Sequence, residues 1–202
     1  MGPVTPSARG THVVLAVDGG GSKTDVVVLR RDGSVLARAR GAGSCPQVIG
    51  IRPAVRIVDD LVHQVLDDLD EPVIDLAGVY LSGLDLDVEI EAFQTAIAQL
   101  AWVDASGRPA IVENDTFALL RTGTAAPQAV AVVCGTGTNC VGRRQDGRTA
   151  RFPALGRISG DWGGGWELGE QAIWHAARAL DGRGPTTALT TLVPAALIAR
   201  TS

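Results

Sequence analysis

The sequence contains little lysine, little cysteine and few aromatic residues. Lys23 is the single lysine among 18 basic residues, three residues are cysteine, and aromatic residues make up 4% of the chain. The formal net charge is −4, which excludes the basic surface by which proteins bind nucleic acid or an anionic membrane. No apolar run reaches the roughly 18 residues of a membrane-spanning helix. The composition therefore points away from nucleic-acid-binding and membrane proteins.

The cysteines and the N-terminus indicate the compartment. Cys45, Cys134 and Cys140 are odd in number and form no Cys-x-x-Cys pair. This spacing lacks the ligand pattern of zinc sites and favours buried or partly buried free thiols over disulfides. Residues 1–11 contain Gly, Pro and Ser but lack the apolar stretch of a signal peptide, which predicts a loose tail. We therefore expect a cytoplasmic protein.

Two glycine-rich segments about 115 residues apart are the most informative feature of the chain. Residues 17–25 read VDGGGSKTD and residues 133–140 read VCGTGTNC, and each lies between β-rich runs. Glycine turns with hydroxyl residues let backbone N–H groups approach phosphate oxygens, so two such turns facing each other would clamp a polyphosphate. Lys23 lies in the first turn, where a compact ammonium would act as a point charge near phosphate. Chance retention of one lysine is the alternative.

Hydrophobic periodicity and turn residues predict alternating elements in the first part of the chain. Strands are expected at 13–17, 24–29, 34–40, 76–81 and 109–112. The first three form an antiparallel meander, because Asp32 and Gly33 between β-rich runs are a hairpin signal. Helices are expected from Pro53 to Pro72, along 90–100 and from 115 to 120.

The pattern then begins again. Strands at 129–133, 139–143 and 149–152 predict a second meander with a turn at 145–147. Glycines 163–165 lead into an amphipathic helix, and Gly182 stands where a left-handed C-terminal cap is expected. A short helix is expected at 186–192, and a further element begins at Pro194.

This internal duplication predicts an α/β protein with two lobes around a nucleotide cleft. The length of 202 residues and the apolar share of 46% are sufficient for one large domain or two small ones. We expect a flexible tail at 1–11, an N-terminal ATPase lobe at 12–125 and the start of a C-terminal ATPase lobe at 126–202. The first lobe is expected to be complete and the second incomplete.

Four segments resemble the motifs of a known family. Residues 18–25 (DGGGSKTD) are similar to its first phosphate motif, 112–115 (VEND) to its catalytic-aspartate segment, 134–139 (CGTGTN) to its second phosphate motif and 156–169 to its substrate loop and following helix. The family is the N-acetylglucosamine kinase and BadF/BadG/BcrA/BcrD-type ATPase family, within the actin-like (ribonuclease H-like) ATPase and sugar kinase superfamily. The resemblance covers about residues 12–193 and implies the actin-like ATPase fold.

The resemblance implies a site for ATP and Mg²⁺. Asp18 would organise Mg²⁺ through water, since Mg²⁺ keeps several of its waters. Thr136 and Gly137 would hold phosphate from the second lobe. The residues expected along the β- and γ-phosphates are Gly20, Gly21, Ser22 and Lys23.

The resemblance also implies a sugar site. Asp115 would take the proton from an attacking sugar hydroxyl, and an acid at the end of a strand is well placed for that role. Hydrogen bonds to the sugar would come from Asn139, Gly156 and Asp161. The partner implied is a small-molecule sugar rather than nucleic acid or a membrane, and a homodimer is compatible with the family.

Two features depart from the family pattern. Family kinases that bind N-acetylglucosamine place an Asn in the loop after the third strand, and here Cys45 stands at about that position in the segment 43–47. This argues against acetamido-sugar specificity. Family members also continue further and carry adenosine-binding glycines, so we expect the second lobe to be truncated in this chain.

Several residues have a structural interpretation beside the functional one. Asp115 could cap the following helix, which is compatible with a role as base. Asp161 could be a solvated loop acid, and Asp25 is expected to cap or pair within its strand rather than to touch metal. The tryptophans at 162, 166 and 174 are expected to pack in the core or against the other lobe.

Three functions are compatible with these residues. The first is ATP-dependent phosphorylation of a hexosamine or hexose in carbohydrate metabolism, with the 6-hydroxyl attacking the γ-phosphate and an Asp as base. The second is an ATPase that activates a dehydratase or reductase through an iron–sulfur cluster, which requires bridging cysteines near a helix start. The third is a truncated, non-catalytic remnant. The motifs favour the sugar kinase.

Overall fold

The computed structural model describes residues 10–104 and 106–199. Most of the predicted tail at 1–11 lies outside these residues. The chain forms two compact units, called here unit 1 (residues 1–129) and unit 2 (residues 130–202). Of the helices in the described part of the chain, none combines the length and apolarity needed to cross a bilayer.

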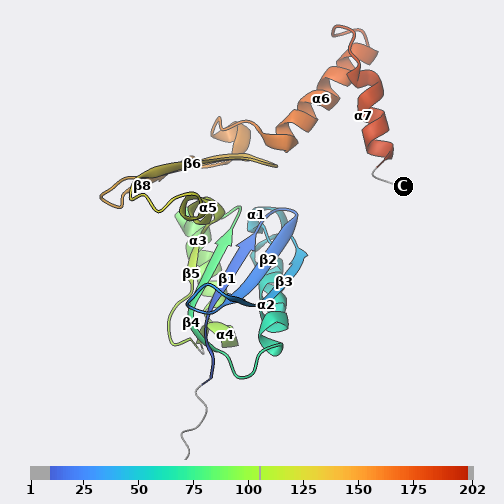
Figure 1. The fold of residues 1–202 in the computed structure, drawn as a ribbon. Coiled ribbons are helices and arrows are strands. Elements are labelled where there is room, and N and C mark those ends of the chain that lie inside the picture. The colour runs from blue at the N-terminus through green and yellow to red at the C-terminus, as the bar shows by residue number, and fades with distance from the viewer. Residues whose placement is uncertain (1–9, 105, 200–202) are drawn as a thin grey trace, which may run out of the picture. The chain divides into compact units, whose positions relative to one another are not determined.

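Unit 1 is a five-stranded sheet with the order β3-β2-β1-β4-β5 (Figure 1). The strands are β1 (His12–Gly19), β2 (Lys23–Leu29), β3 (Val35–Ala42), β4 (Val73–Leu81) and β5 (Ile111–Asn114). β1, β2 and β3 form an antiparallel meander, whereas β4 runs parallel to β1 and β5 parallel to β4. The helices are α1 (Pro46–Ile49), α2 (Ile51–Asp67), α3 (Asp87–Ile97), α4 (Ala101–Asp104) and α5 (Asp115–Gly123).

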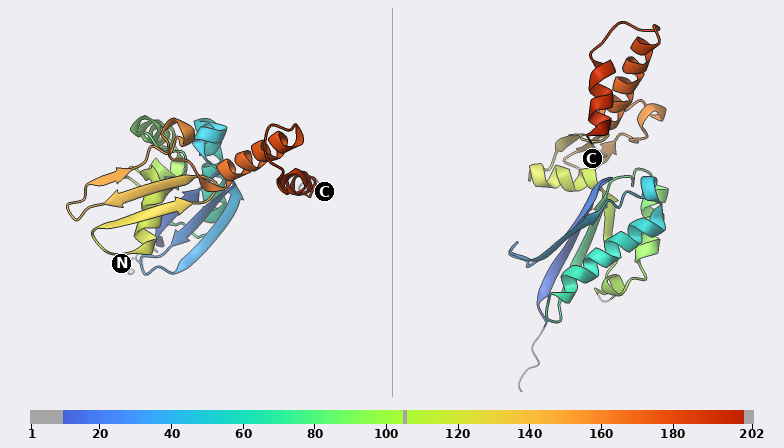
Figure 2. Two further views of the ribbon diagram at one scale, coloured as in Figure 1. Left: turned by 90° about the horizontal axis from the view of Figure 1, so that it is seen from above. Right: turned by 90° about the vertical axis from the view of Figure 1, so that its right-hand side faces the viewer.

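The core of unit 1 lies between one face of the sheet and the helices packed on it. Side chains alternate along a strand, and in β1 the buried set is Val13, Leu15 and Val17. Helix α2 runs along this face (Figure 2, right panel) and buries a stripe of residues at helical spacing. That stripe comprises Ala54, Val58, Leu61, Val62 and Val65.

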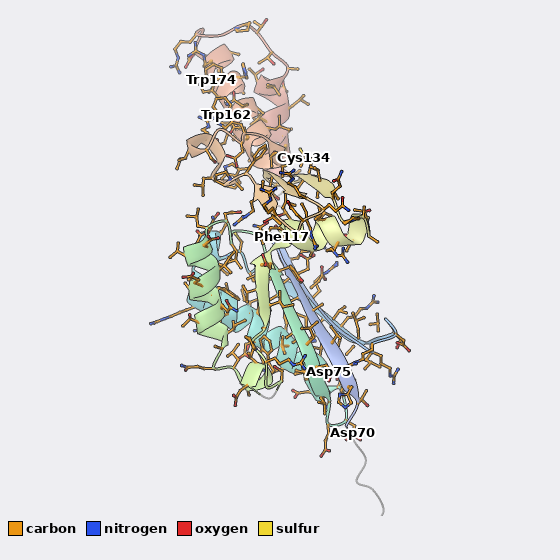
Figure 3. All side chains as sticks on the ribbon, turned by 90° about the vertical axis from the view of Figure 1, so that its left-hand side faces the viewer. Asp70, Asp75, Phe117, Cys134, Trp162 and Trp174 are labelled. Carbon is orange, nitrogen blue, oxygen red and sulfur yellow. The ribbon has the colours of Figure 1, made fainter. Side chains whose placement is uncertain are left out.

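Strand register brings the candidate residues of unit 1 to one edge of the sheet. Gly19 at the end of β1 pairs with Leu81 at the end of β4, which pairs with Asn114 at the end of β5. Carboxyl ends of parallel strands share an edge, which is the usual ligand side of such sheets. Asp75 of β4 marks the opposite end of the sheet from Phe117 of α5 (Figure 3).

Unit 2 contains a three-stranded sheet with the order β6-β7-β8 followed by helices. Its elements are β6 (Ala129–Cys134), β7 (Thr138–Arg143), β8 (Thr149–Arg151), the 3₁₀ turn η1 (Gly156–Ile158), α6 (Gly164–Leu180) and α7 (Leu189–Ile198). Both Gly147, in the turn between β7 and β8, and Gly182, after α6, have the positive φ that their predicted turn and cap require.

The structure confirms both meanders and corrects several details. Helices α1 and α4 were not predicted, because four residues are too few to show a helical period. Helix α2 ends at Asp67 rather than at Pro72. Strand β5 begins at Ile111, two residues later than expected. The predicted break at Pro194 is wrong, since α7 continues through it. Proline removes one helical hydrogen bond, and the Leu and Ala residues around it favour the helix.

Candidate functional site

The glycine turn of unit 1 connects β1 to β2 and is braced by the segment after β3. The Gly20 N–H donates to the Lys23 carbonyl at 2.8 Å, and the Ser44 N–H donates to the Gly20 carbonyl at 3.0 Å. A Cβ at Gly43 would lie 2.4 Å from the Gly21 carbonyl oxygen, so this segment approaches the turn as closely as glycine allows. Gly21, Ser22 and Lys23 remain exposed. The turn is therefore fixed on one side and open to a ligand on the other.

A buried hydroxyl network supports this turn. The Thr24 hydroxyl donates to the Ala42 carbonyl at 2.7 Å, and the Thr24 and Ser44 hydroxyl oxygens are hydrogen-bonded at 2.8 Å. Neither Thr24 nor Ser44 is exposed. A Cβ at Gly19 would lie 2.2 Å from the Ser44 Oγ and 2.3 Å from the Leu81 Cδ2, so only glycine fits there. Gly19, the first glycine of the motif, therefore allows close packing beneath the turn.

Charged side chains cluster beside the turn. Lys23 Nζ lies 3.1 Å from Asp25 Oδ2, and Arg40 donates to both oxygens of Asp25 at 2.5 and 3.0 Å. The hydrogen bonds from Arg40 are the main cause that lowers the pKa of Asp25. The expectation that Asp25 pairs within its strand is confirmed. Desolvation raises the pKa of Asp18, Asp25 raises it further, and Lys23 partly offsets both.

The residues present fit a magnesium ion held mainly by water and phosphate. Within the part of the chain that the structure describes, no group of three or more His, Cys, Asp or Glu residues could hold a metal ion. An all-protein cage is thus excluded there, and Asp18 would be a lone carboxylate ligand, as Mg²⁺ beside phosphates often has. Desolvation raises the pKa of Asp18, and a nearby cation would oppose that effect by favouring the ionised carboxylate.

Asp115 begins α5 at the carboxyl end of β5, but it does not cap the helix. Asn114 is the N-cap, and its Oδ1 accepts hydrogen bonds from the Thr116 N–H at 3.1 Å and hydroxyl at 2.5 Å. The interpretation of Asp115 as the cap is therefore wrong, because the fully buried Asn114 occupies that position. Asp115 stands in the first turn, where the helix dipole stabilises a negative charge.

Asp85 is a site residue that the sequence analysis missed. It lies in the loop after β4 and is 7% exposed. Its Oδ1 accepts from Asn114 Nδ2 at 2.9 Å and its Oδ2 accepts from Gln47 Nε2 at 3.1 Å. Its backbone N–H donates to Glu89 Oε2 at 2.9 Å. An acid four residues after a buried strand, on the ligand edge of the sheet, is the signal that could have indicated it.

Cys45 faces the same loop. The residue is 7% exposed, and a Cβ at Gly83 would lie 2.6 Å from its sulfur. All three cysteines are free thiols, as predicted, although Cys134 is exposed rather than buried. The side chain at the family's asparagine position thus packs on the backbone of the loop after β4.

The glycine turn of unit 2 rests on the start of α6. The N–H groups of Gly165 and Trp166 donate to the carbonyls of Gly135 and Thr136 at 2.7 and 2.9 Å. A Cβ at Gly164, which has positive φ, would lie 2.7 Å from the Thr136 carbonyl oxygen. Thr136 and Gly137 are exposed. The helix therefore fixes the turn and leaves its outer side accessible.

The predicted sugar residues of unit 2 lie in β7 and in the segment between β8 and α6. Asn139 is in β7, where its Oδ1 accepts from the Cys140 N–H at 2.7 Å, and Gly156 begins η1 with φ 62°. The Ser159 hydroxyl donates to Asp161 Oδ1. Among the described residues, Asp161 Oδ2 and Thr138 Oγ1 are buried without a hydrogen-bond partner. Such atoms are rare in folded proteins and fit a ligand-binding role.

The tryptophans of unit 2 are not core residues. Trp162, Trp166 and Trp174 are 65, 69 and 51% exposed (Figure 3 labels the first and last). The expectation that they pack in the core is wrong, because at least half of each residue is exposed. The ring of Trp174 contacts His175 and the Arg178 guanidinium. Packing against the other lobe stays a prediction.

Known proteins resemble this chain over most of its length. It is 29% identical over 178 residues to the N-acetylmuramic acid/N-acetylglucosamine kinase of Clostridium acetobutylicum, covering 87% of this chain and 57% of that protein. It is 26% identical over 189 residues to the N-acetyl-D-glucosamine kinase of Dictyostelium discoideum, covering 89% and 58%. The chain thus spans less than two thirds of the length of these relatives.

A solved structure and a family profile agree with these relatives. The crystal structure of a candidate N-acetylglucosamine kinase from Chromobacterium violaceum superposes with a TM-score of 0.66 at 25% identity, covering 90% of this chain and 62% of that one. The fold is therefore the α/β fold of the actin-like sugar kinases, as expected. Residues 15–198 match the BadF/BadG/BcrA/BcrD ATPase family. The chain belongs to the BadF/BadG/BcrA/BcrD ATPase family.

Proposed function

We propose that this protein is an ATP-dependent kinase that phosphorylates the 6-hydroxyl of a hexosamine or hexose. The observation that carries the proposal is the common edge of the unit 1 sheet. There the glycine turn after β1 and Asp115 after β5 stand at the carboxyl ends of two parallel strands that flank β4. Both curated relatives are named as kinases of N-acetylated sugars.

Both units carry residues that we propose bind phosphate. In unit 1 the turn at Gly20, Gly21 and Ser22, in which Gly21 and Ser22 are exposed, would bind the β- and γ-phosphates, with Lys23 as a nearby point charge. Asp18 would orient the waters of Mg²⁺, which neutralises phosphate charge when bound. In unit 2 the exposed turn at Thr136 and Gly137 would bind phosphate through its backbone.

Asp115 is the proposed base. Phosphoryl transfer requires positioning, charge neutralisation and one proton acceptor, with little covalent chemistry for the protein. Asp115 would accept the proton of the 6-hydroxyl as its oxygen attacks the γ-phosphate. Asn139, Gly156 and Asp161 of unit 2 would hydrogen-bond the sugar, and the buried, unpartnered Oδ2 of Asp161 supports that role.

The cysteines do not favour the reductase-activator alternative. A bridging cluster needs accessible cysteines near a helix start. Cys45 precedes α1 but is buried, whereas Cys134 ends β6 and Cys140 lies within β7. Cytoplasmic location and homodimerisation stay predictions.

The test is a coupled ADP-release assay on the complete product of the reading frame that contains these residues. MgATP is combined with glucosamine, glucose and N-acetylglucosamine in turn, and ³¹P NMR identifies the phosphorylated position. We expect sugar-dependent ADP release and a 6-phosphate ester. ATP hydrolysis that no sugar stimulates, or phosphate on another hydroxyl, would contradict the proposal.

A further inference from the structure

We propose that Asp85 is a positioning residue. It fixes the candidate base, Asp115, relative to the segment 43–47, which carries Cys45 at about the position of the family's sugar-binding asparagine. This inference rests on the proposed function. At 7% exposure the Asp85 carboxylate is nearly removed from water. A buried carboxylate is costly unless it is hydrogen-bonded, and this one is bonded to side chains from two other segments. Asp85 lies at the edge of the sheet where ligands bind, so a functional role explains why a carboxylate is buried there despite its cost.

The side-chain amides of Asn114 and Gln47 are each held in one orientation by their neighbours. The Oδ1 of Asn114 accepts from both the N–H and the hydroxyl of Thr116, so its NH₂ group must face Asp85. The NH₂ group of Gln47 lies 3.1 Å from Asp85 and 3.4 Å from Glu89 Oε1. Rotation of the Gln47 amide would set its carbonyl against two acids. Position 85 must therefore offer two acceptors, which a carboxylate has and an amide lacks.

The Asp85 carboxylate connects the two segments proposed to face the sugar, which are the start of α5 and residues 43–47. Asn114 immediately precedes Asp115, and it is also the cap that fixes the start of α5. Gln47 lies in α1, two residues after Cys45. Displacement of about 1 Å at a reacting group can cost on the order of 10²-fold in rate. Loss of either hydrogen bond to Asp85 should therefore lower turnover. The backbone hydrogen bond from Ser44 to Gly20 and the buried hydrogen bond between Thr24 and Ser44 should keep the glycine turn in place.

Glu89 fixes the backbone of the loop that carries Asp85. Its Oε2 accepts from the backbone N–H groups of Asp85 and Leu86 at 2.9 and 2.8 Å, which caps α3 and fixes the backbone of the loop. The side chain of Asp85 is thus presented by a loop with little freedom, and its role is to hold its neighbours rather than to contact substrate.

The experiment compares Asp85→Asn with Asp87→Asn, an equal change at an exposed residue of the same segment. In the complete reading-frame product we expect Asp85→Asn to lower kcat at least 30-fold while the Kd for MgATP, measured by calorimetry, changes less than twofold. Asp87→Asn should leave both within twofold. A kcat within threefold of wild type, or an equal loss of MgATP binding, would overturn the inference.

A second variant keeps the test valid if Asp85→Asn fails to fold. Gln47→Met removes one donor at an exposed position and leaves the Asn114 contact intact. It should still fold, with a somewhat lower Tm because Asp85 loses one partner, and lower kcat about tenfold. An unchanged kcat would overturn the inference. An active wild type with active variants refutes only the role of Asp85, whereas a wild type that phosphorylates no sugar refutes the proposed function and this inference with it.

Discussion

The hydroxyl oxygens of Thr24 and Ser44 lie 2.8 Å apart in the interior of unit 1, 20 residues apart in sequence. This hydrogen bond fastens the segment after β3 to the start of β2, directly beneath the glycine turn. Both side chains are fully buried, so neither hydroxyl can exchange its partner for bulk water. The position of the turn therefore depends on this pair.

Ser44→Ala should destabilise unit 1 by about 1–3 kcal/mol, because it leaves a buried hydroxyl with one partner fewer. Thr24→Val should cost a similar amount. Urea unfolding provides the measurement, and Thr95→Val on the exposed side of α3 is the control, with an expected change within about 0.5 kcal/mol. If Ser44→Ala, Thr24→Val and the control Thr95→Val all unfold at the same urea midpoint, the stabilising role of the hydroxyl network is refuted.

Gly19→Ala should destabilise unit 1 by about 1–3 kcal/mol through overpacking. The added methyl group would meet Ser44 and Leu81 at 2.2 and 2.3 Å, whereas the same group at Gly21 would meet nothing within 4 Å. Gly21→Ala is therefore the matched control and should unfold close to wild type. A Gly19 variant as stable as the Gly21 variant would contradict the packing role.

Asp18→Asn should stabilise unit 1 at neutral pH. Desolvation and Asp25 raise the pKa of Asp18 above its ordinary 3.8, so the ionised carboxylate opposes folding above that raised pKa. As pH falls through the raised pKa toward 3.8, the penalty disappears because the folded state binds the proton first. Urea midpoints from pH 7 to pH 3 should thus show a gain for Asp18→Asn that fades on acidification. A gain in urea midpoint that increases as the pH falls would mean that the direction given for the pKa shift of Asp18 is wrong.

Asp115→Asn should abolish sugar phosphorylation and leave MgATP binding intact. The proposed base acts on the acceptor hydroxyl, and a general base contributes typically 10²–10⁴-fold. ADP release at saturating sugar measures turnover, and calorimetry measures MgATP binding. Asp104→Asn, an exposed acid in α4, is the control. Retention of more than about a tenth of kcat would refute the role.

The enzyme should prefer glucosamine or glucose to N-acetylglucosamine. Cys45 stands about where the family carries Asn, and its sulfur packs against Gly83, so it offers an acetamido group no strong partner. An unpaired polar group costs roughly 1–3 kcal/mol on burial. Values of kcat/KM for the three sugars decide the matter, and Cys45→Asn should shift the ratio toward N-acetylglucosamine. A tenfold wild-type preference for N-acetylglucosamine would point to the exposed Gln47 as the residue that binds the acetamide, because the Ser44 hydroxyl is buried against Thr24.

The sequence by itself determined the local elements and the family. Alternation in β1, the helical stripe of α2 and the positive-φ glycines of the hairpins are set by residues a few positions apart. These signals predicted both meanders and the two glycine turns, and the resemblance of four motifs in the right order indicated the family. Residues 18–25 and 134–139 need no distant partner to be recognised as turns.

Only the tertiary structure decided which polar residues support the site. Whether Asn114 or Asp115 caps α5 depends on which side chain faces inward at the end of β5, and both are good caps in isolation. Asp85 meets Gln47 and Asn114 across 38 and 29 residues of sequence. Arg40 of β3 meets Asp25 of β2 because the antiparallel register places the two residues opposite each other. Such contacts follow from strand register and burial, which no local pattern encodes.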